Sequence, residues 1–199
     1  MKKLIILVVF LMPFIAYTQP VQFDKDSIPT VQGRVIFHVH FEFNLDEKEF
    51  HQKIYDYLIH KFSPYSGKFL TDKKDYISCE VSDYLGIANS PIQKFGMYMT
   101  YNLHFEWEDG LCNMSLLNIS YMKKGAFEAD VSKKRKRTLT RFSAKEIMIN
   151  KNFHLMFIGN VSERITELSI NRINEIINDL YASFEKGRFI EVGSTEEIE

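Results

Sequence analysis

The chain has 199 residues, of which 45% are hydrophobic and 14% aromatic, and its formal net charge is −1. This length suffices for one domain with a substantial core, and the aromatic content excludes a predominantly disordered chain. The near-neutral charge argues against a protein built as a whole to bind nucleic acid.

The N-terminus has the pattern of a secretory signal peptide. Two lysines precede the apolar run 4–15, and the segment 16–18 (Ala-Tyr-Thr) places small residues before an expected cleavage site at Gln19. The apolar run is short for a membrane span, and no cysteine stands at the cleavage site to carry a lipid anchor. We therefore expect residues 1–18 to be removed and the product to be free in the periplasm or secreted, with no stable membrane span. A retained N-terminal helical anchor is the alternative.

The domain is expected to begin with a strand and a helix. Residues 19–32 contain two prolines and no apolar period, so they predict a leader. Over residues 33–43 apolar side chains take alternate positions, which is typical of a strand with one buried face. A helix is predicted after Asp46, whose carboxylate can cap free amides, and Pro64 ends it. The apolar stripe of this helix comprises Phe50, Ile54, Tyr57, Leu58 and Phe62.

Two long strands joined at Asp109-Gly110 form the clearest pattern in the sequence. A shorter strand is expected before them, over residues 76–85. Between residues 97 and 107 the apolar side chains take the odd positions, and Asp-Gly favours a two-residue turn with positive φ. Such a turn pairs positions whose numbers sum to 219, so Trp107 is expected to face Cys112.

The C-terminal part begins with a basic segment. Residues 123–141 carry eight basic side chains against two acidic ones and predict an exposed loop. Segment 143–158 opens with the spacing of a capping box and predicts a helical or partly helical stretch. A long helix is predicted from Asn160 to Gly187, and residues 191–199 predict a disordered acidic tail. The stripe of the long helix comprises Ile165, Ile173, Ile176, Ile177, Leu180 and Phe184.

These segments together predict a single α+β domain over residues 33–190. Their order along the chain is strand, helix, three strands and two helices (β-α-β-β-β-α-α). Helices gathered on one face of a twisted antiparallel sheet make a two-layer architecture.

Four features carry a resemblance to a known family. They are the signal peptide ending Ala-Tyr-Thr-Gln, the strand 33–43, the helix that starts with segment 46–50 (Asp-Glu-Lys-Glu-Phe), and the long hairpin with its acidic-Gly turn. Over residues 31–124 the chain resembles the secreted Bacteroidetes domain of unknown function with a TATA-binding-protein-like (TBP-like) fold. The resemblance implies a twisted antiparallel sheet with helices on one side, and the family has no assigned activity. The name of the fold implies no nucleic-acid role, because function belongs to a site.

Three histidines are the candidate metal ligands. His38 and His40 lie on the even face of the first strand, and His104 lies on the even face of the hairpin. Imidazoles at this spacing suit zinc or copper, but a site needs three or four ligands within about 2.0–2.2 Å of one ion. Histidines that decorate an exposed sheet are the alternative.

The even face of the hairpin is unusually apolar and aromatic for a solvated surface. The register places Tyr121 opposite Tyr98 and Ile119 opposite Thr100 on this face. A contiguous patch of this kind predicts a binding or dimerisation surface. Its expected members are Tyr98, Thr100, Asn102, Leu117, Ile119 and Tyr121. The alternative is that segment 143–158 covers the face, because the apolar side chains of that segment also need burial.

A basic patch lies within the predicted loop. It comprises Lys133, Lys134, Arg135, Lys136 and Arg137. Such a run resembles a nucleic-acid or nuclear-targeting motif, but it has no interleaved aromatic side chains on which bases could stack. In an exported protein it predicts a solvated loop, and weak attraction to anionic lipid or polysaccharide is the alternative.

Cys79 and Cys112 both lie in predicted strands. An exported protein can form disulfides, but strands that are not neighbours hold their Cα atoms too far apart for one. We therefore expect two buried free thiols.

The sequence contains none of the common catalytic motifs, such as G-x-S-x-G, H-E-x-x-H, a phosphate-binding loop or a dinucleotide fingerprint. We therefore expect a non-enzymatic binding module without a cofactor, which contacts a protein or envelope partner through the sheet face or a loop edge. Nucleic acid is not expected as a partner. The alternative is a small hydrolase or metal-binding protein that uses His38, His40 and His104.

Overall fold

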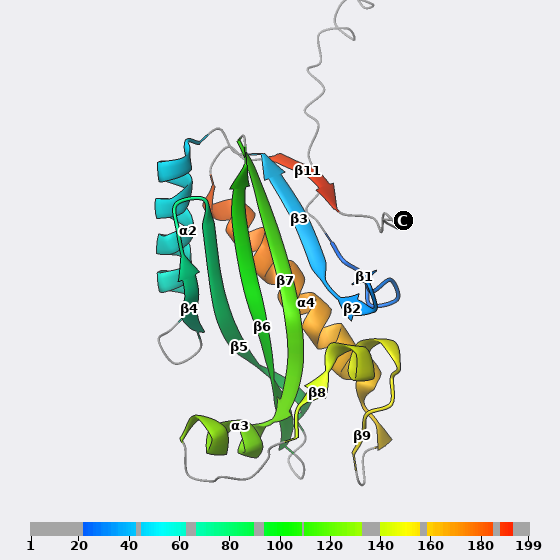
Figure 1. Cartoon of the computed structure of the whole chain (residues 1–199). Helices are drawn as coiled ribbons and strands as arrows, with labels where there is room; N and C mark the ends of the chain where they lie inside the picture. The colour runs from blue at the N-terminus through cyan, green and yellow to red at the C-terminus, as the bar shows by residue number, and fades with distance from the viewer. Residues whose placement is uncertain are drawn as a thin grey trace, which may run out of the picture.

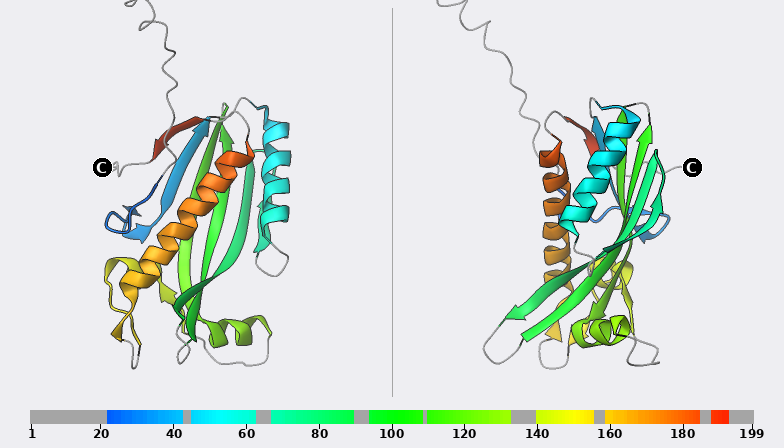
Figure 2. Two further views of the ribbon diagram at one scale, coloured as in Figure 1. Left: turned by 180° about the vertical axis from the view of Figure 1, so that it is seen from behind. Right: turned by 90° about the vertical axis from the view of Figure 1, so that its left-hand side faces the viewer.

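The computed structural model describes residues 22–42, 45–62, 67–89, 94–108, 110–132, 140–155, 159–184 and 188–192. A twisted antiparallel sheet forms one layer, and helices α2 (Glu47–Lys61) and α4 (Ser162–Ser183) form the second layer (Figure 1). Figure 2 shows α4 crossing the back of the sheet diagonally, with α2 beside it. The predicted two-layer α+β class is therefore confirmed.

The main sheet has the strand order β11-β3-β7-β6-β5-β4, and β8 also pairs with β7. Its strands are β3 (Phe37–Glu42), β4 (Gly67–Asp72), β5 (Tyr76–Asn89), β6 (Lys94–Glu108), β7 (Leu111–Lys123), β8 (Phe142–Ser143) and β11 (Arg188–Val192). Strands β4, β8 and β11 were not predicted. Each is short and lies at an edge, where pairing with a longer neighbour decides strand formation more than local pattern does.

Two short hairpins accompany the main sheet. They are β1 (Thr30–Val31) with β2 (Arg34–Val35), and β9 (His154–Leu155) with β10 (Gly159–Asn160). The first hairpin falls partly within the segment predicted as a leader. The leader also docks on α4, because the backbone N–H of Phe23 donates to Oδ1 of Asn174 at 2.8 Å and the Phe23 side chain is buried.

Helix α2 begins where the sequence predicts. Oδ1 of Asp46 accepts a hydrogen bond from the backbone N–H of Glu49 at 2.8 Å. This contact satisfies one of the free amides at the start of the helix. The predicted apolar stripe of α2 is directed to the sheet, with Phe50, Ile54 and Leu58 buried.

Strands β6 and β7 form the central hairpin, and their register near the turn is the predicted one. Glu108 pairs with Leu111, and Gly110 has a φ of +88°, as a two-residue turn requires. The pairs continue with a sum of 219 as far as Asn102 and Leu117.

A β-bulge at Asn118 then shifts the register by one residue. Asn118 has a φ of +57°, in the left-handed region of backbone space. Beyond the bulge Tyr121 pairs with Met99 rather than with Tyr98. A shift of one residue turns each later side chain to the other face of the sheet. The prediction that Tyr121 faces Tyr98 is therefore wrong.

Two residues that were expected on the reverse face consequently lie in the core. Ile119 is 5% exposed and Tyr121 is fully buried. The hydroxyl of Tyr121 lies 2.9 Å from Oγ of Ser169 on α4, and Ser169 itself donates to the carbonyl of Ile165. The prediction that Ile119 faces Thr100 is also wrong, because the bulge at Asn118 precedes both Ile119 and Tyr121 in β7.

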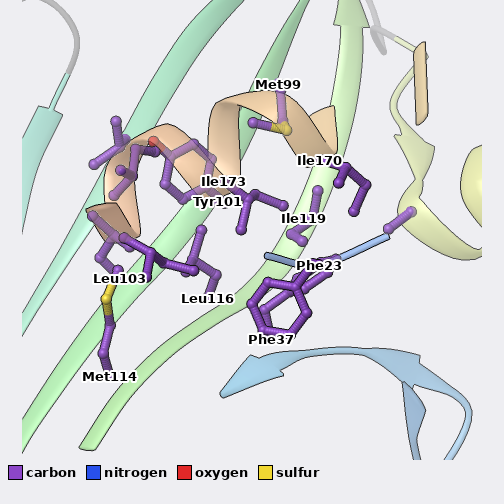
Figure 3. Packing of buried hydrophobic residues seen from close by; sticks show 14 of the residues in the cluster. Phe23, Phe37, Met99, Tyr101, Leu103, Met114, Leu116, Ile119, Ile170 and Ile173 are labelled. Carbon is purple, nitrogen blue, oxygen red and sulfur yellow. The ribbon is translucent and has the colours of Figure 1, made fainter. Parts of the chain in front are cut away.

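The core is the layer between the two helices and the odd-numbered side chains of β6. Figure 3 shows Ile170 and Ile173 of α4 among sheet residues that include Tyr101 and Ile119. The predicted stripe of α4 is buried throughout. Full burial of one large aliphatic side chain contributes roughly 1.5–3 kcal/mol, so this layer supplies most of the driving force for folding.

The segment predicted as a basic loop is partly helical. Lys124–Val131 form helix α3, and the ring of Phe127 on this helix stacks on Tyr98 with 4.0 Å between ring centroids. The prediction of a loop over residues 123–141 is therefore wrong for α3. The aromatic contact with the sheet stabilises helix there, which the charge pattern did not indicate. The basic patch 133–137 lies outside the described residues.

The segment 143–158 is only briefly helical. The predicted capping box forms, because the backbone N–H of Ser143 donates to Glu146 and that of Glu146 donates to Oγ of Ser143. It opens a five-residue π-helix, η1 (Lys145–Ile149), rather than a longer helix. Lys151 follows with a φ of +50°, which turns the chain toward β9.

Cys79 and Cys112 are free and buried, as expected. They belong to β5 and β7, which β6 separates. Burial raises the pKa of the Cys79 thiol to about 12 and raises that of Cys112 as well. Both thiols are therefore protonated at neutral pH, and neither is an activated nucleophile.

The ends of the chain lie mostly outside the described residues, including the predicted signal peptide and its cleavage site. The predicted C-terminal boundary at residue 190 falls within β11, which extends to Val192 and pairs with β3. In the part of the chain that the structure describes, no helix is both long and apolar enough to cross a membrane.

Substitution of Asn118 tests the bulge. Asn118→Val is expected to lower the free energy of unfolding by about 1–2 kcal/mol, because a β-branched residue is strained at positive φ. Asn118→Gly is expected to leave the stability close to that of the wild type, because glycine adopts positive φ without strain. Urea denaturation followed by Trp107 fluorescence measures both effects. Glu106→Val, at an exposed position in the regular part of β6, is the control, and an equal loss at Glu106 and Asn118 would contradict the bulge.

Candidate functional site

The sheet has one face without a helix over its centre, which we call the open face. It is the side opposite α2 and α4, and it carries the even-numbered side chains of β3, β5 and β6. Figure 1 shows β3, β7 and β6 in front of α4, with α3 only at one end of the strands. The side chains at the centre of the open face are half-buried, because they pack beside one another.

A row of polar side chains crosses four strands of this face. His38 pairs with Ser115, Ser115 pairs with His104, and His104 pairs with Ser78. Oγ of Ser115 lies 2.8 Å from Nδ1 of His38, and the hydroxyl of Tyr76 lies 2.8 Å from Nδ1 of His104. Each of these two histidine rings is therefore held by a partner on the neighbouring strand.

A second polar pair lies beside this row. Nδ1 of His40 is 2.6 Å from Oδ1 of Asn113. Because an amide oxygen only accepts, Nδ1 of His40 donates to it. Asn113 pairs across the next strand boundary with Glu106. We call His38, His40, Tyr76, His104, Asn113 and Ser115 the polar row.

Partial burial favours the neutral forms of two histidines of the polar row, His38 and His104. Burial lowers the pKa of His38, and the neighbouring His40 lowers it further. Burial also lowers the pKa of His104. Both rings are therefore uncharged at pH 7, and each presents hydrogen-bonding groups without a net charge.

The geometry does not gather the three histidines around one point. His38 and His104 lie on β3 and β6 with β7 between them, which separates their Cα atoms by about 9–10 Å. Nδ1 of each histidine is already in a hydrogen bond. No group of three or more His, Cys, Asp or Glu side chains is placed to share a metal ion among the described residues. The arrangement favours histidines that decorate a polar sheet face.

Ser115 and His38 have the residue types of a nucleophile and its base, but the surroundings do not suit catalysis. At Ser115, β7 has β3 on one side and β6 on the other. The backbone N–H of Ser115 therefore faces a paired strand on either side of β7 and is not a free donor. An acyl-transfer site needs free donors aimed at the developing oxyanion. The hydrolase alternative gains no support from this geometry.

Four of the six residues predicted for a binding surface lie on the open face. Asn102 and Leu117 face each other beside the polar row, and both are half-buried. Thr100 is only 8% exposed, and its Oγ1 lies 2.9 Å from Oγ of Ser82. Tyr98 lies at the end of the face that α3 covers. The other two predicted residues lie in the core, as described above.

The described part of segment 143–158, the alternative cover for this face, is residues 143–155. Ile147 and Met148 of η1 are buried in the core cluster, and η1 packs against α4. Residues 143–155 therefore do not cover the centre of the open face.

Sequence reasoning missed the partners of the histidines. Tyr76, Ser78, Asn113 and Ser115 were not singled out as site residues. One signal for Ser115 was present, because the register sum of 219 pairs it with His104. The pairing of β3 with β7 was not readable from the sequence, since its paired residues are 69 to 79 positions apart.

Comparisons with known proteins identify the fold of the chain. No family model matches the chain, and no curated protein matches it. The structure is similar to the crystal structure of a DUF4468 family protein from Bacteroides ovatus ATCC 8483, with a TM-score of 0.62, 12% identity and coverage of 80% of this chain and 91% of that one. It is also similar to a TBP-like protein from Parabacteroides distasonis ATCC 8503, with a TM-score of 0.60, 11% identity and coverage of 80% and 97%. The chain therefore has the TBP-like α+β fold that the sequence resemblance implied.

The lowered pKa values of His38 and His104 predict a pH-dependent stability. In the unfolded chain the pKa of both histidines is about 6.5, which is above their pKa in the folded protein. As the pH falls, the unfolded state therefore binds more protons than the folded state does. The free energy of unfolding is expected to decrease below about pH 6.5, and His38→Gln/His104→Gln is expected to flatten this decrease. Urea denaturation at about pH 7.5 and about pH 5.5 measures the difference. The exposed His154→Gln is the control, and an unchanged slope in the double variant would contradict the assignment.

Proposed function

We propose that this protein is an exported, non-enzymatic binding module that contacts a partner protein through the open face. The observation that carries the proposal is the polar row, whose side chains are fixed by hydrogen bonds across strands on a face without a covering helix. Fixed side chains lose little conformational entropy on association, which favours recognition. Acyl-transfer catalysis would need free donors aimed at a developing oxyanion, and the backbone amide of Ser115 is committed to strand pairing.

The shape of the open face favours a macromolecule over a small ligand. Small-molecule sites are concave, whereas this face is the surface of a sheet. The cavities of about 390, 300 and 480 Å³ lie beside β4, beside the end of β3, and at the C-terminal part of α2, and none is lined by a residue of the polar row. A broad sheet surface therefore fits a partner with a complementary surface of its own.

The chemistry of the open face favours a protein as that partner. Neutral donors and acceptors of the polar row alternate with Leu117 and with the ring of Tyr76. Protein interfaces combine aromatic and apolar contacts with about one hydrogen bond per 100–200 Å², and charged groups are depleted at their centre. The neutral state of His38 and His104 agrees with such a centre.

The signal-peptide pattern indicates the compartment in which a partner is expected. The pattern of residues 1–18 leads us to propose that the mature chain reaches the periplasm or the medium without a membrane anchor, so its partner is expected in the cell envelope or outside the cell. A nucleic-acid partner does not fit that compartment or the near-neutral charge of the chain.

Site-specific crosslinking tests the proposal. A photo-crosslinking amino acid at Asn102 is expected to capture a protein from the envelope or medium of producing cells, because Asn102 lies beside the polar row. The same group at Glu175, an exposed position of α4, is the matched control. The captured protein is then purified, and His38→Ala/His104→Ala is expected to weaken its affinity by at least about tenfold, as for side chains at the centre of an interface.

The control for the affinity measurement is His154→Ala, which removes an exposed imidazole from β9. Equal capture from Asn102 and Glu175 would contradict binding through the open face. An affinity that is unchanged in the double variant, with its fold intact by circular dichroism, would contradict a role for the polar row.

A further inference from the structure

A cavity of about 300 Å³ lies where β7 changes its partner along one edge. Along β7, pairing with β3 ends at Leu116, which faces Phe37. Pairing with β8 begins at Ser120, which faces Ser143. Along this edge the stretch 117–119 of β7 has no strand partner among the described residues, and it includes the bulge at Asn118. Peptide groups in such a gap are free to meet a ligand or water.

Two exposed cationic residues line this cavity. Arg34 comes from β2, and Lys145 is the first residue of η1. Nζ of Lys145 lies beside the turn that precedes Arg34, because a Cβ placed on Gly33 would lie 4.0 Å from it. Two positively charged residues from distant parts of the chain therefore border the same cavity.

The cavity has no described acidic residue to balance these charges. Its remaining lining is neutral, with Val35, Ile36, Leu117 and Ile119 as its large apolar members. Within the described part of the chain, neither Arg34 nor Lys145 has a carboxylate within 4.0 Å. Glu146, the nearest acid in sequence to Lys145, directs Oε2 to the backbone N–H and hydroxyl of Ser143. Two like charges in one volume repel each other, and an anion between them would relieve the repulsion.

We propose that this cavity binds the phosphate group of an organic phosphate. Arginine offers a planar fork of donors that matches phosphate oxygens, and lysine supplies a second positive charge. Asn118 adds a polar side chain at the bulge, and the apolar lining gives a surface for the organic part of the ligand. The cavity shares Leu117 with the open face but none of the residues of the polar row, so the variants of His38 and His104 test the open face separately from this cavity.

Nuclear magnetic resonance titration of the purified protein tests the proposal. Phenyl phosphate is the probe, and phenol is the neutral comparison. Phenyl phosphate is expected to cause saturable shifts of the amide signals of Gly33, Asn118 and Lys145, while phenol at the same concentration is not. Arg34→Gln and Lys145→Gln are each expected to weaken binding by at least about tenfold, because each removes a charge-assisted contact.

Two control variants test whether the loss of phenyl phosphate binding is specific to the cavity. Arg164→Gln and Lys151→Gln remove exposed charges that pair with Glu167 and Glu163, away from the cavity, and are expected to leave binding unchanged. If one cavity variant fails to fold, the other decides the result. The proposal is overturned by an absence of saturable shifts at Gly33, Asn118 and Lys145, or by an equal loss of affinity in the control variants.

A second arm identifies the source of the phosphate group. Vesicles of phosphatidate mixed with phosphatidylcholine present it on a lipid, and phenyl phosphate presents it on a free molecule. Co-sedimentation with phosphatidate vesicles that Arg34→Gln abolishes and Arg164→Gln preserves assigns the cavity to a lipid headgroup. Binding of phenyl phosphate without such co-sedimentation assigns it to a free phosphate ester.

Discussion

The structure depends on the alternation of side chains along β6, which commits one face of the sheet to the core. Its odd-numbered side chains from Met97 to Phe105 are fully buried in the core. Because strand side chains alternate, this burial leaves the even-numbered positions on the opposite face. The same constraint explains the bulge at Asn118, which turns Tyr121 toward α4 and gives its hydroxyl a partner in Ser169. A buried hydroxyl without such a partner would be unfavourable.

The open face owes its chemistry to pairing between strands that are distant in sequence. β7 lies between β3 and β6, so Ser115 stands between two histidines and Asn113 stands beside a third. These contacts hold the rings in place and partly bury them, which keeps His38 and His104 uncharged. A polar surface whose side chains are held by hydrogen bonds suits association with another protein better than it suits metal binding, where the imidazoles would have to converge.

The TBP-like fold accounts for the shared architecture and leaves the individual sites to this sequence. The two similar structures match about four fifths of this chain at 11–12% identity. At that distance the likeness shows the fold alone, and a function belongs to a site rather than to a fold. The polar row and the cavity lined by Arg34 and Lys145 therefore rest on the residues of this chain.

The sequence by itself determined α2, α4, the hairpin turn and the two-layer α+β class, because each depends on local periodicity, capping or turn chemistry. It also indicated the polar side of β3 and β6 through His38, His40 and His104. Only the tertiary structure decided that β7 lies between those strands, that Asn118 shifts the register, and that Phe127 holds α3 on Tyr98. Those features depend on contacts between distant segments, and alternation within a single strand carries no information about which strand becomes its neighbour.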